Sequence, residues 1–586
     1  KQGNLIFNHD RSENGVFTYD SKFTLFKIKV WKDSITEMKR RKVKKDKMPL
    51  DSLGIFNIDK LTLQKISNIK SYKIPEKWSG FIAYTYEILS GQKEKKNQDS
   101  EVSVKNKSSK KLKKPSSKNG YPLVIRNLDS SVEDTIPYVT NYTFSKKSES
   151  LAYTTTGIKD SIQAGVYIKN LKSNSIKHVY SSHDKTKYYK LSLSDSGKNL
   201  AFVVDADSTK SYNRPYELYS WNFKNEKAKL IVNKSNSPKG YRVSSDGNLK
   251  FSGDETKLYF GLALPEIVQD TLLLDEEIVN VEVWTYDEPR LYTIQEMQLN
   301  NDKKKSFKTV FHFKDQKLIQ IGSKEYPNSI LTDDANDDYA LVYSTEPYQL
   351  SSQWTGQFSK NDLAIVNVNN GLSKLAIKGN PSPASLSPNG EYAYGYNQVD
   401  STWYTYNIKT SKYIELTKGK MFYNELSDYP NHPRSYGAAG WTKNDKSILI
   451  YDRYDIWEFN PETGLNKRLT KGREKQTSYR YVKLDSEVKH IPVNKKILLN
   501  TFNESTKESG YYEIDVKTSK GNQLLKGPFR YSSPKKARLS DDLMFTRQSF
   551  EEFPNIRISD LSFTSEVVIS DVNPQQSDYN WGTAEL

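Results

Sequence analysis

An acidic triplet in the middle of the chain is the first group of residues that could do chemistry. Asp275, Glu276 and Glu277 precede an alternating segment that ends at Trp284, and Arg290 follows shortly after it. Carboxylates form strong charge-assisted hydrogen bonds, so the triplet could hold the cationic amino terminus of a peptide. A charged loop at the mouth of a sheet repeat would give the same pattern, and we favour that interpretation. The triplet and Arg290 remain candidates for substrate binding.

A second charged and aromatic stretch is YDRYDIW at residues 451–457. In a strand, alternation would place Asp452 and Arg453 on opposite faces. We favour an ion pair with a neighbouring strand for these two residues, and contact with a substrate is the alternative.

The motif of the α/β-hydrolases is absent from the sequence. These enzymes need a serine within G-x-S-x-G, on a strained turn that exposes its hydroxyl. Only Gly371 has a serine two residues later, and Leu375 stands where the second glycine is required. We therefore expect no catalytic residue in this chain.

No cofactor and no metal are expected either. The chain has no cysteine, no Walker phosphate loop and six histidines, none of which are three or four residues apart. The run DDANDD at 333–338 resembles half of a calcium loop. However, Tyr339 and Thr345 occupy the positions that require glycine and glutamate, so we predict a turn there.

The net charge of +17 is concentrated in two short stretches. Residues 39–47 and 93–118 carry +13 of it and contain almost no large apolar side chains. Such segments are typical of solvated loops, although contact with acidic lipid or with a partner is the alternative. We expect no nucleic-acid partner, because no element offers the side chains that read base edges. No apolar run approaches the roughly 18 residues of a membrane span, so we do not expect a transmembrane protein.

A pattern of a polar turn followed by a short alternating strand recurs along the chain. Clear copies occupy 144–154, 192–204, 252–262, 385–396 and 441–451, and weaker ones occupy 18–28, 75–85, 332–343, 492–502 and 539–547. A spacing of roughly 45–60 residues is typical of four-stranded propeller blades. Helical periodicity is hard to find, and no parallel α/β pattern occurs. The sequence therefore predicts an all-β propeller over 1–572, with seven or eight blades. The alternative is that the same residues form two propellers. Insertions are expected at about 88–122, which is Lys-rich and predicted to be disordered, and at 264–300.

Several segments resemble the amino-terminal half of large bacterial peptidases of the prolyl-oligopeptidase family. They are MPLDSLGIFNI (48–58), SYKIPEKWSGFIAYTYE (71–87), DEEIVNVEVWTYDEPRLYTIQE (275–296), AGWTKNDKSILIYDRYDIWEFNP (439–461), FNESTKESGYYEI (502–514) and NPQQSDYNWGTAEL (573–586). The resemblance implies a propeller that covers the active site of an α/β-hydrolase domain and admits short or unfolded peptides.

The resemblance also implies how the whole protein is organised. Residues 573–586 would begin the linker, and the serine, aspartate and histidine of the hydrolase domain would lie beyond Leu586 in the full-length chain. The family's dipeptidyl-peptidase branch anchors substrates with a glutamate pair in a D-W-x-Y-E-E-type motif. This motif is missing, so that role is not transferred to Glu276 and Glu277. A signal peptide before Lys1 and an extracytoplasmic location in a bacterium, periplasmic or associated with the outer membrane, are further expectations.

Three functions therefore remain open from the sequence. The first is the substrate-gating, non-catalytic part of an exported serine peptidase that cleaves oligopeptides. The second is a stand-alone propeller that binds or scaffolds at the bacterial cell envelope with a protein partner. The third is binding of nucleic acid or membrane through the lysine runs. Under the third, deletion of 93–118 would abolish binding.

Overall fold

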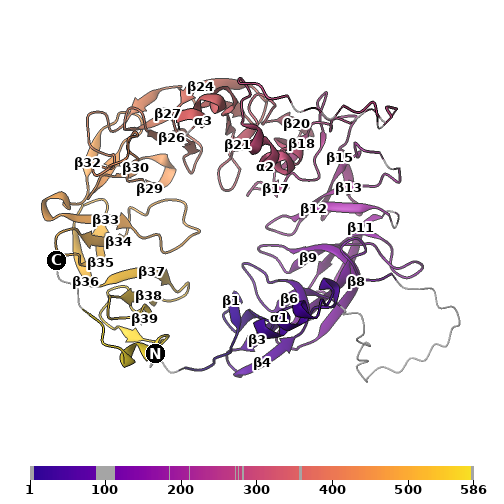
Figure 1. The fold of residues 1–586 in the computed structure, drawn as a ribbon, viewed down its shortest axis with the longest axis horizontal. Coiled ribbons are helices and arrows are strands. Elements are labelled where there is room, and N and C mark those ends of the chain that lie inside the picture. The colour runs from indigo at the N-terminus through magenta and orange to yellow at the C-terminus, as the bar shows by residue number, and fades with distance from the viewer. Residues whose placement is uncertain are drawn as a thin grey trace. The chain divides into compact units, whose positions relative to one another are not determined.

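The computed structural model describes residues 5–87, 113–181, 183, 185–209, 211–268, 270, 272–274, 276–279, 281, 283–355 and 359–582. Almost all regular structure in this part of the chain is antiparallel sheet, and, apart from β16 and β17, which both pair with β18, successive strands of a sheet are neighbours (Figure 1). The all-β class and its four-stranded repeats, which are those of propeller blades, are therefore confirmed.

The chain divides into two compact units, which are described separately. The first, here called the amino-terminal unit, comprises Phe7–Asn280 and Leu299–Gln320. The second, the carboxy-terminal unit, comprises Lys1–Ile6, Val281–Gln298 and Ile321–Leu586.

The amino-terminal unit contains four sheets among its described residues. The first contains β1 (Ser12–Phe17), β2 (Phe23–Ile28), β3 (Ser52–Asn57) and β4 (Thr62–Ile66). The second has seven strands, β5 (Ile69–Lys73), β6 (Phe81–Tyr86), β7 (Tyr121–Asn127), β8 (Glu133–Phe144), β9 (Ser150–Thr155), β10 (Gly165–Asn170) and β11 (Ser175–Ser181). The third contains β12 (Lys187–Leu193), β13 (Asn199–Asp205), β14 (Glu217–Asn222) and β15 (Lys229–Val232). The fourth contains β16 (Arg242–Val243), β17 (Lys250–Phe251), β18 (Lys257–Ala263), β19 (Phe307–His312) and β20 (Lys317–Gln320).

The carboxy-terminal unit contains five four-stranded sheets among its described residues. They are β21 (Asn328–Ile330), β22 (Tyr339–Ser344), β23 (Asn361–Asn367) and β24 (Ser373–Asn380); β25 (Ala384–Leu386), β26 (Tyr392–Asn397), β27 (Thr402–Asn407) and β28 (Tyr413–Glu415). Next come β29 (Ala438–Trp441), β30 (Ile448–Tyr451), β31 (Ile456–Phe459) and β32 (Asn466–Arg468). The last two are β33 (Thr477–Tyr481), β34 (Lys496–Asn503), β35 (Ser509–Asp515) and β36 (Gly521–Gly527), and then β37 (Arg530–Lys536), β38 (Leu543–Gln548), β39 (Asn555–Ser559) and β40 (Val567–Val568).

The long strand β8 makes the seven-stranded sheet equivalent to two repeats. Its first half pairs with β7 and its second half pairs with β9, with Val139 at the change of partner. The described residues therefore form ten repeats, five in each unit, rather than the seven or eight that we predicted. Nine of them have four strands, and in the tenth the short strands β16 and β17 both pair with β18. The ten predicted turn–strand copies each lead into the second strand of one repeat, namely β2, β6, β9, β13, β18, β22, β26, β30, β34 and β38.

A buried hydroxyl closes the turn before the second strand in five repeats. The hydroxyl oxygen accepts the backbone N–H of the residue five positions later, at 2.9–3.1 Å, in the pairs Thr18–Phe23, Ser194–Asn199, Ser252–Lys257, Ser387–Tyr392 and Thr442–Ser447. The backbone N–H of each Ser or Thr donates to the carbonyl of the same partner. All five hydroxyl residues are at most 4% exposed. Because a buried N–H without a partner is costly, this contact fixes where each second strand begins.

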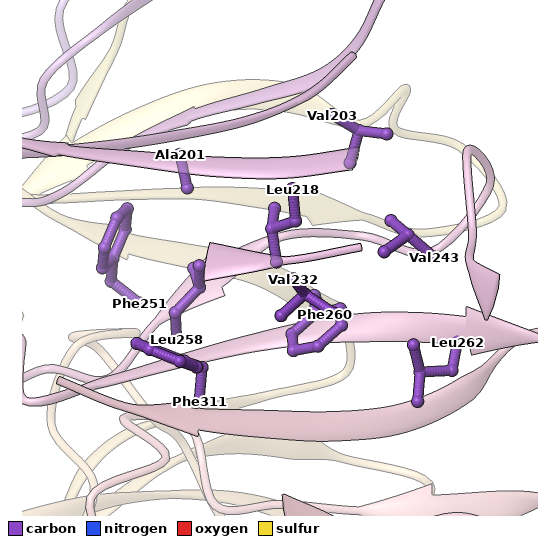
Figure 2. Close-up of a cluster of buried hydrophobic side chains, with 10 residues drawn as sticks. All are labelled: Ala201, Val203, Leu218, Val232, Val243, Phe251, Leu258, Phe260, Leu262 and Phe311. Carbon is purple, nitrogen blue, oxygen red and sulfur yellow. The ribbon is translucent and has the colours of Figure 1, made fainter. Parts of the chain in front are cut away.

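The core lies between the faces of successive sheets. In the amino-terminal unit, Ala201 of β13 and Leu218 of β14 face Leu258 and Phe260 of β18 and Phe311 of β19 (Figure 2). The alternating strands place these side chains on one face, and burial of each large apolar side chain contributes about 1.5–3 kcal/mol. The repeats are thus held together by packing between sheets as well as by hydrogen bonds within them.

Three short α-helices among the described residues were not predicted. They are α1 (Lys32–Arg40), α2 (Tyr292–Lys303) and α3 (Gln349–Thr355), and the 3₁₀ turns are η1 (Lys45–Lys47), η2 (Glu346–Tyr348), η3 (Lys443–Asp445), η4 (Arg473–Lys475) and η5 (Pro574–Asp578). None of the three α-helices has a buried residue. They are short, of seven to twelve residues, so each offers only a few apolar positions from which a helical period could be recognised.

The structure also locates the predicted insertions. Residues 88–112 lie outside the described residues, and the other end of the expected 88–122 insertion enters β7 at Tyr121. The expected 264–300 insertion lies between β18 and β19 and contains most of α2. The basic stretch 39–47 forms the exposed end of α1 and η1 rather than a simple loop.

The turn contact predicts a stability loss that does not depend on side-chain volume. Ser387→Ala leaves the buried N–H of Tyr392 without its partner and should cost about 1–3 kcal/mol. Differential scanning calorimetry should show a Tm lowered by roughly 2–4 °C for each kcal/mol. Thr442→Val, which keeps the side-chain shape, should have a similar effect.

The exposed Ser505 provides the matched control, and Ser505→Ala should leave the Tm unchanged. Equal Tm values for Ser387→Ala and the unmodified chain would show that the turn does not depend on its hydroxyl.

Candidate functional site

The acidic triplet predicted from the sequence lies in the segment between β18 and β19. Asp275 falls outside the described residues, and Glu276 is exposed. Glu277 accepts the backbone N–H of Leu274 at 2.8 Å, a local contact that orders the turn. Arg290 is half-buried just before α2, and its carbonyl accepts a hydrogen bond from Gln295 at 2.8 Å. Their role in substrate binding stays a prediction.

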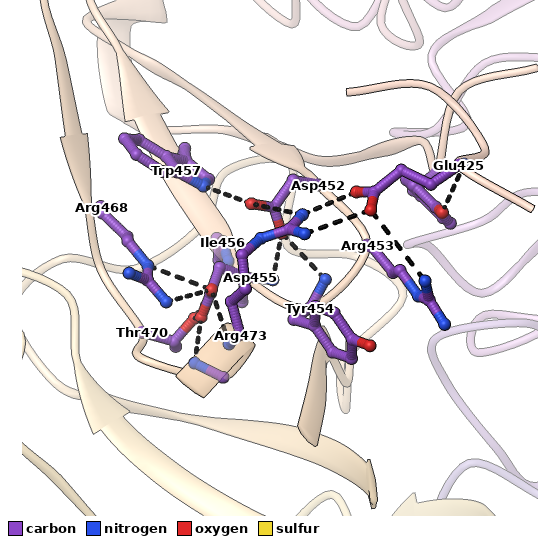
Figure 3. A network of polar contacts seen from close by, with 12 residues as sticks. Glu425, Asp452, Arg453, Tyr454, Asp455, Ile456, Trp457, Arg468, Thr470 and Arg473 are labelled. Atoms are coloured by element: carbon purple, nitrogen blue, oxygen red, sulfur yellow. Dashed lines mark hydrogen bonds and ion pairs between the residues drawn. The ribbon is translucent and has the colours of Figure 1, made fainter. Parts of the chain in front are cut away.

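Asp452 and Arg453 lie in a turn between β30 and β31, and not in the strand that we expected. Asp452 is buried, and its carboxylate accepts the N–H groups of Tyr454 and Asp455 and the indole N–H of Trp457 (Figure 3). A carboxylate that accepts several N–H groups stabilises a tight turn, which is why strand alternation does not apply here.

Asp455, two residues from Arg453, is the most deeply buried acid of this turn. Its side chain is fully buried and accepts hydrogen bonds from the hydroxyl of Thr470 at 2.7 Å and from the guanidinium of Arg468 at 2.6 Å (Figure 3). The backbone N–H groups of Gly472 and Arg473 complete its shell. A buried charge is tolerated only when it is paired and fully hydrogen-bonded, so this carboxylate fixes β31 against the start of η4.

Arg453 joins the β29–β32 sheet to the β33–β36 sheet. Its Nη2 lies 2.5 Å from Glu504 Oε2, and its Nε donates to Oε1 at 3.2 Å. The hydroxyl of Tyr454 donates to the same carboxylate at 2.6 Å. Glu504 lies in the hairpin between β34 and β35, so the position of that hairpin is set by the neighbouring sheet.

Two further arginines complete the cluster. Arg473 forms a two-point contact with Glu425, at 2.6 and 3.1 Å. Arg480 donates to the carbonyl oxygens of Asp452 and Arg453 at 3.1 and 2.9 Å and lies over the ring of Tyr451. With Arg468 and Glu474, these residues form what we call the arginine–carboxylate cluster.

The pKa shifts in the cluster follow from these contacts. Burial alone would raise the pKa of Glu504, but the hydrogen bonds from Arg453 and Tyr454 outweigh it and hold that pKa below its usual value. The hydrogen bond from Arg468 lowers the pKa of Glu474 to about 2. Hydrogen bonding to Glu425 raises the pKa of Arg473. All of these groups are charged near neutral pH, so the cluster is suited to structure and not to proton transfer.

A cleft of about 980 Å³ lies next to the cluster in the same unit, between β33 and β34 on one side and β37 on the other. Aromatic side chains form much of its wall, including Tyr481, Phe502, Phe529, Tyr531 and Phe550. Ser509 links β35 to the start of β37 at this cleft. Its hydroxyl accepts the N–H of Tyr531 at 3.2 Å and donates to the carbonyl of Phe529.

The charged residues that line this cleft are all basic. They are Lys483, Lys507 and Arg530, and none of the described aspartates and glutamates lines it. Lys507 belongs to the same hairpin as Glu504, so the Arg453–Glu504 ion pair also positions one wall of the cleft. Asp452 and Arg453 are therefore not part of the lining, but they support it.

Sequence reasoning missed the cleft. Its basic residues come from 483, 507 and 530, which are separated by more than 20 residues and belong to no motif. The repeat pattern located β34 and β38, but it could not show that two successive repeats leave a cleft. No signal in the sequence would have identified this set.

No group of acids and histidines that could hold a metal ion occurs in the part of the chain that the structure describes. The run 333–338 forms a turn, as predicted, and Asp334 pairs there with Lys489. None of the described helices is long and apolar enough to span a membrane.

Comparison with known proteins adds only a broad likeness. No protein-family model and no curated protein matches the sequence. Among solved structures, Porphyromonas gingivalis dipeptidyl peptidase 4 matches with 12% identity and a TM-score of 0.32, over 79% of this chain and 59% of that chain. The β-propeller domain of the Trilobed protease from Pyrococcus furiosus matches with 12% identity and a TM-score of 0.23, over 74% and 96%. TolB from Acinetobacter baumannii matches with 11% identity and a TM-score of 0.22, over 71% and 75%.

Two of these three structures are from peptidases by name, and this chain spans less than two thirds of the length of the dipeptidyl peptidase. At such low TM-scores the matches assign no activity to the chain.

The ion pair between sheets predicts a coupling that depends on pH. In a double-mutant cycle with Arg453→Met and Glu504→Gln, we expect a coupling of about 1 kcal/mol at pH 7, a modest value because both side chains are partly exposed. The folded-state pKa of Glu504 is lowered, so this stability is complete above the unfolded pKa of about 4.3. It is lost as the pH falls through the folded-state pKa, so urea unfolding at pH 3 should show much less coupling.

The exposed pair Lys418–Glu415 gives the control cycle, with Lys418→Met and Glu415→Gln, and should show a coupling under about 0.5 kcal/mol at both pH values. A coupling between Arg453 and Glu504 that is absent at pH 7, or identical at pH 3, would contradict the assignment.

Proposed function

We propose that this chain is the substrate-gating, non-catalytic part of an exported serine peptidase of the prolyl-oligopeptidase family. In this proposal, an α/β-hydrolase domain in the same full-length chain carries the nucleophile, and oligopeptides are the substrates.

One observation in particular supports the proposal. Two of the segments that resemble the family, 439–461 and 502–514, come from different sheets and meet at the Arg453–Glu504 ion pair. A resemblance to the family that includes both residues of an ion pair supports a shared structure better than a resemblance confined to scattered loops. The reason is that Arg453 and Glu504 can form this contact only when both are present.

The physical properties of the repeats suit a gate. Sheets joined by buried charge clusters and by packed apolar faces are rigid, so they can exclude folded proteins from a reaction centre by size. Exclusion of bulk water would also strengthen electrostatic interactions at that centre. The gate itself needs only a binding surface, and the aromatic cleft between the last two sheets provides one.

The cellular context belongs to the same proposal. We infer a location outside the cytoplasm of a bacterium, in the periplasm or at the outer membrane, with an envelope protein as a further partner. The second candidate, a stand-alone propeller that binds at the cell envelope, is favoured by the same cleft, because a binding cleft serves a scaffold equally well.

Intact mass and active-site labelling of the native protein test the proposal. A gated peptidase should have a mass above the 67.5 kDa of this chain by an α/β domain of about 250 residues. A fluorophosphonate probe should label it at one serine outside residues 1–586, and heat-denatured protein should not be labelled.

A native mass near 67.5 kDa without labelling would refute the peptidase assignment and leave the scaffold function. Labelling within residues 1–586 would contradict the non-catalytic role.

A further inference from the structure

The three cations of the cleft form no ion pair with an acid in the part of the chain that the structure describes. Among the described residues, no carboxylate oxygen lies within 4.0 Å of the charged nitrogens of Lys483, Lys507 or Arg530. Three like charges around one cavity repel each other, and this arrangement is stabilised when a negatively charged group enters.

Three acids near the cleft are paired with other cations, whereas Asp485, two residues after Lys483, forms no ion pair with a cation of the cleft. Glu504 is paired with Arg453, and Glu508 is paired with Lys526. Glu552 is paired with Arg547 and Arg557. These acids form their ion pairs with cations outside the cleft, so Lys483, Lys507 and Arg530 remain available to a ligand.

Two side-chain amides line the same cleft without a hydrogen-bond partner among the described residues. They belong to Asn500 and Gln548. A primary amide offers both donors and an acceptor, so it can pair with the N–H and C=O of a peptide backbone. This feature favours a peptide over an anion that offers acceptors alone.

Apolar contacts are provided by exposed rings at the cleft. Phe502 is 40% exposed and Phe550 is 66% exposed. Aromatic rings that are exposed to solvent favour contact with apolar side chains of a partner. The cavity of about 980 Å³ is near the upper end of the 300–1,000 Å³ range of ligand sites, so it can hold several residues of extended chain.

We propose that this cleft binds extended peptides in which acidic side chains alternate with apolar ones. Lys483, Lys507 and Arg530 would contact the carboxylates, Asn500 and Gln548 the backbone, and the rings the apolar side chains. The inference takes the peptide nature of the ligand from the proposed function, and it takes the acidic and apolar character from the cleft itself.

Fluorescence anisotropy on the 586-residue chain tests this directly. The probe is a labelled, end-blocked octapeptide that alternates Glu with Leu, and its neutral counterpart has Gln in place of Glu. We expect the acidic peptide to bind at least tenfold more tightly than the neutral one. The difference should shrink in 1 M salt, where the Debye length falls to about 3 Å.

Variants then locate the site. Lys483→Ala combined with Arg530→Ala should weaken binding of the acidic peptide about tenfold, or about 1.4 kcal/mol, and change binding of the neutral peptide less than twofold. The control pair Lys409→Ala and Lys520→Ala changes the net charge equally at two exposed lysines that do not line the cleft, and it should keep full affinity. Circular dichroism of each variant verifies that the fold is retained.

Three results would overturn the inference: equal affinity for the two peptides, unchanged binding in the cleft variant, or equal weakening in the control variant. Tighter binding of an octamer of deoxythymidine, lost in the same cleft variant, would assign the cleft to single-stranded nucleic acid instead. Because only binding is measured, a native protein without a hydrolase domain would refute the proposed function and leave this test unaffected.

Discussion

The hydroxyl of a buried Ser or Thr at the entrance to the second strand is the contact on which the repeats depend. It accepts one N–H that the sheet itself cannot satisfy, and it does so in at least five repeats spread over both units. Since the second strand is central in its sheet, its starting residue sets the register of the strands that follow. The apolar faces then meet the next sheet as in Figure 2. A short polar turn thus determines where apolar side chains are buried.

Charge plays the corresponding part between sheets in the carboxy-terminal unit. Asp455 is completely buried, and its shell of hydroxyl, guanidinium and backbone donors compensates the loss of water. From this anchored turn, Arg453 reaches Glu504 on the next sheet and so holds the hairpin that carries Lys507. The basic cleft is therefore built next to a paired cluster, while Lys483, Lys507 and Arg530, which line it, form no ion pair among the described residues.

The sequence predicted the class of fold well because each repeat begins with a local feature, a polar turn followed by a short alternating strand. Turn residues followed by alternating apolar residues identified the second strand of all ten repeats. The predicted number of seven or eight blades was too low because it was taken from typical propellers. Helices α1, α2 and α3 were missed, since they are short and bury no residue.

The site was less predictable from the sequence than the fold. Asp452 and Arg453 were singled out correctly as charged residues with ion-pair partners, but their partners come from other segments and could not be named. The cleft depends on side chains from three separate segments. A single sequence does not show which distant segments lie close together in the fold. Sequence reasoning finds contacts that repeat along the chain, and it does not find those that arise once between sheets.

Hydrogen exchange at single-residue resolution tests the central claim most directly, through the backbone N–H groups of Phe23, Asn199, Lys257, Tyr392 and Ser447. If buried hydroxyls close the repeats, these five amides will exchange as slowly as the interior amides of the second strands that they begin. Exchange as fast as that of the exposed turn residues around them would contradict the account, because the repeats would then be held by the strands alone.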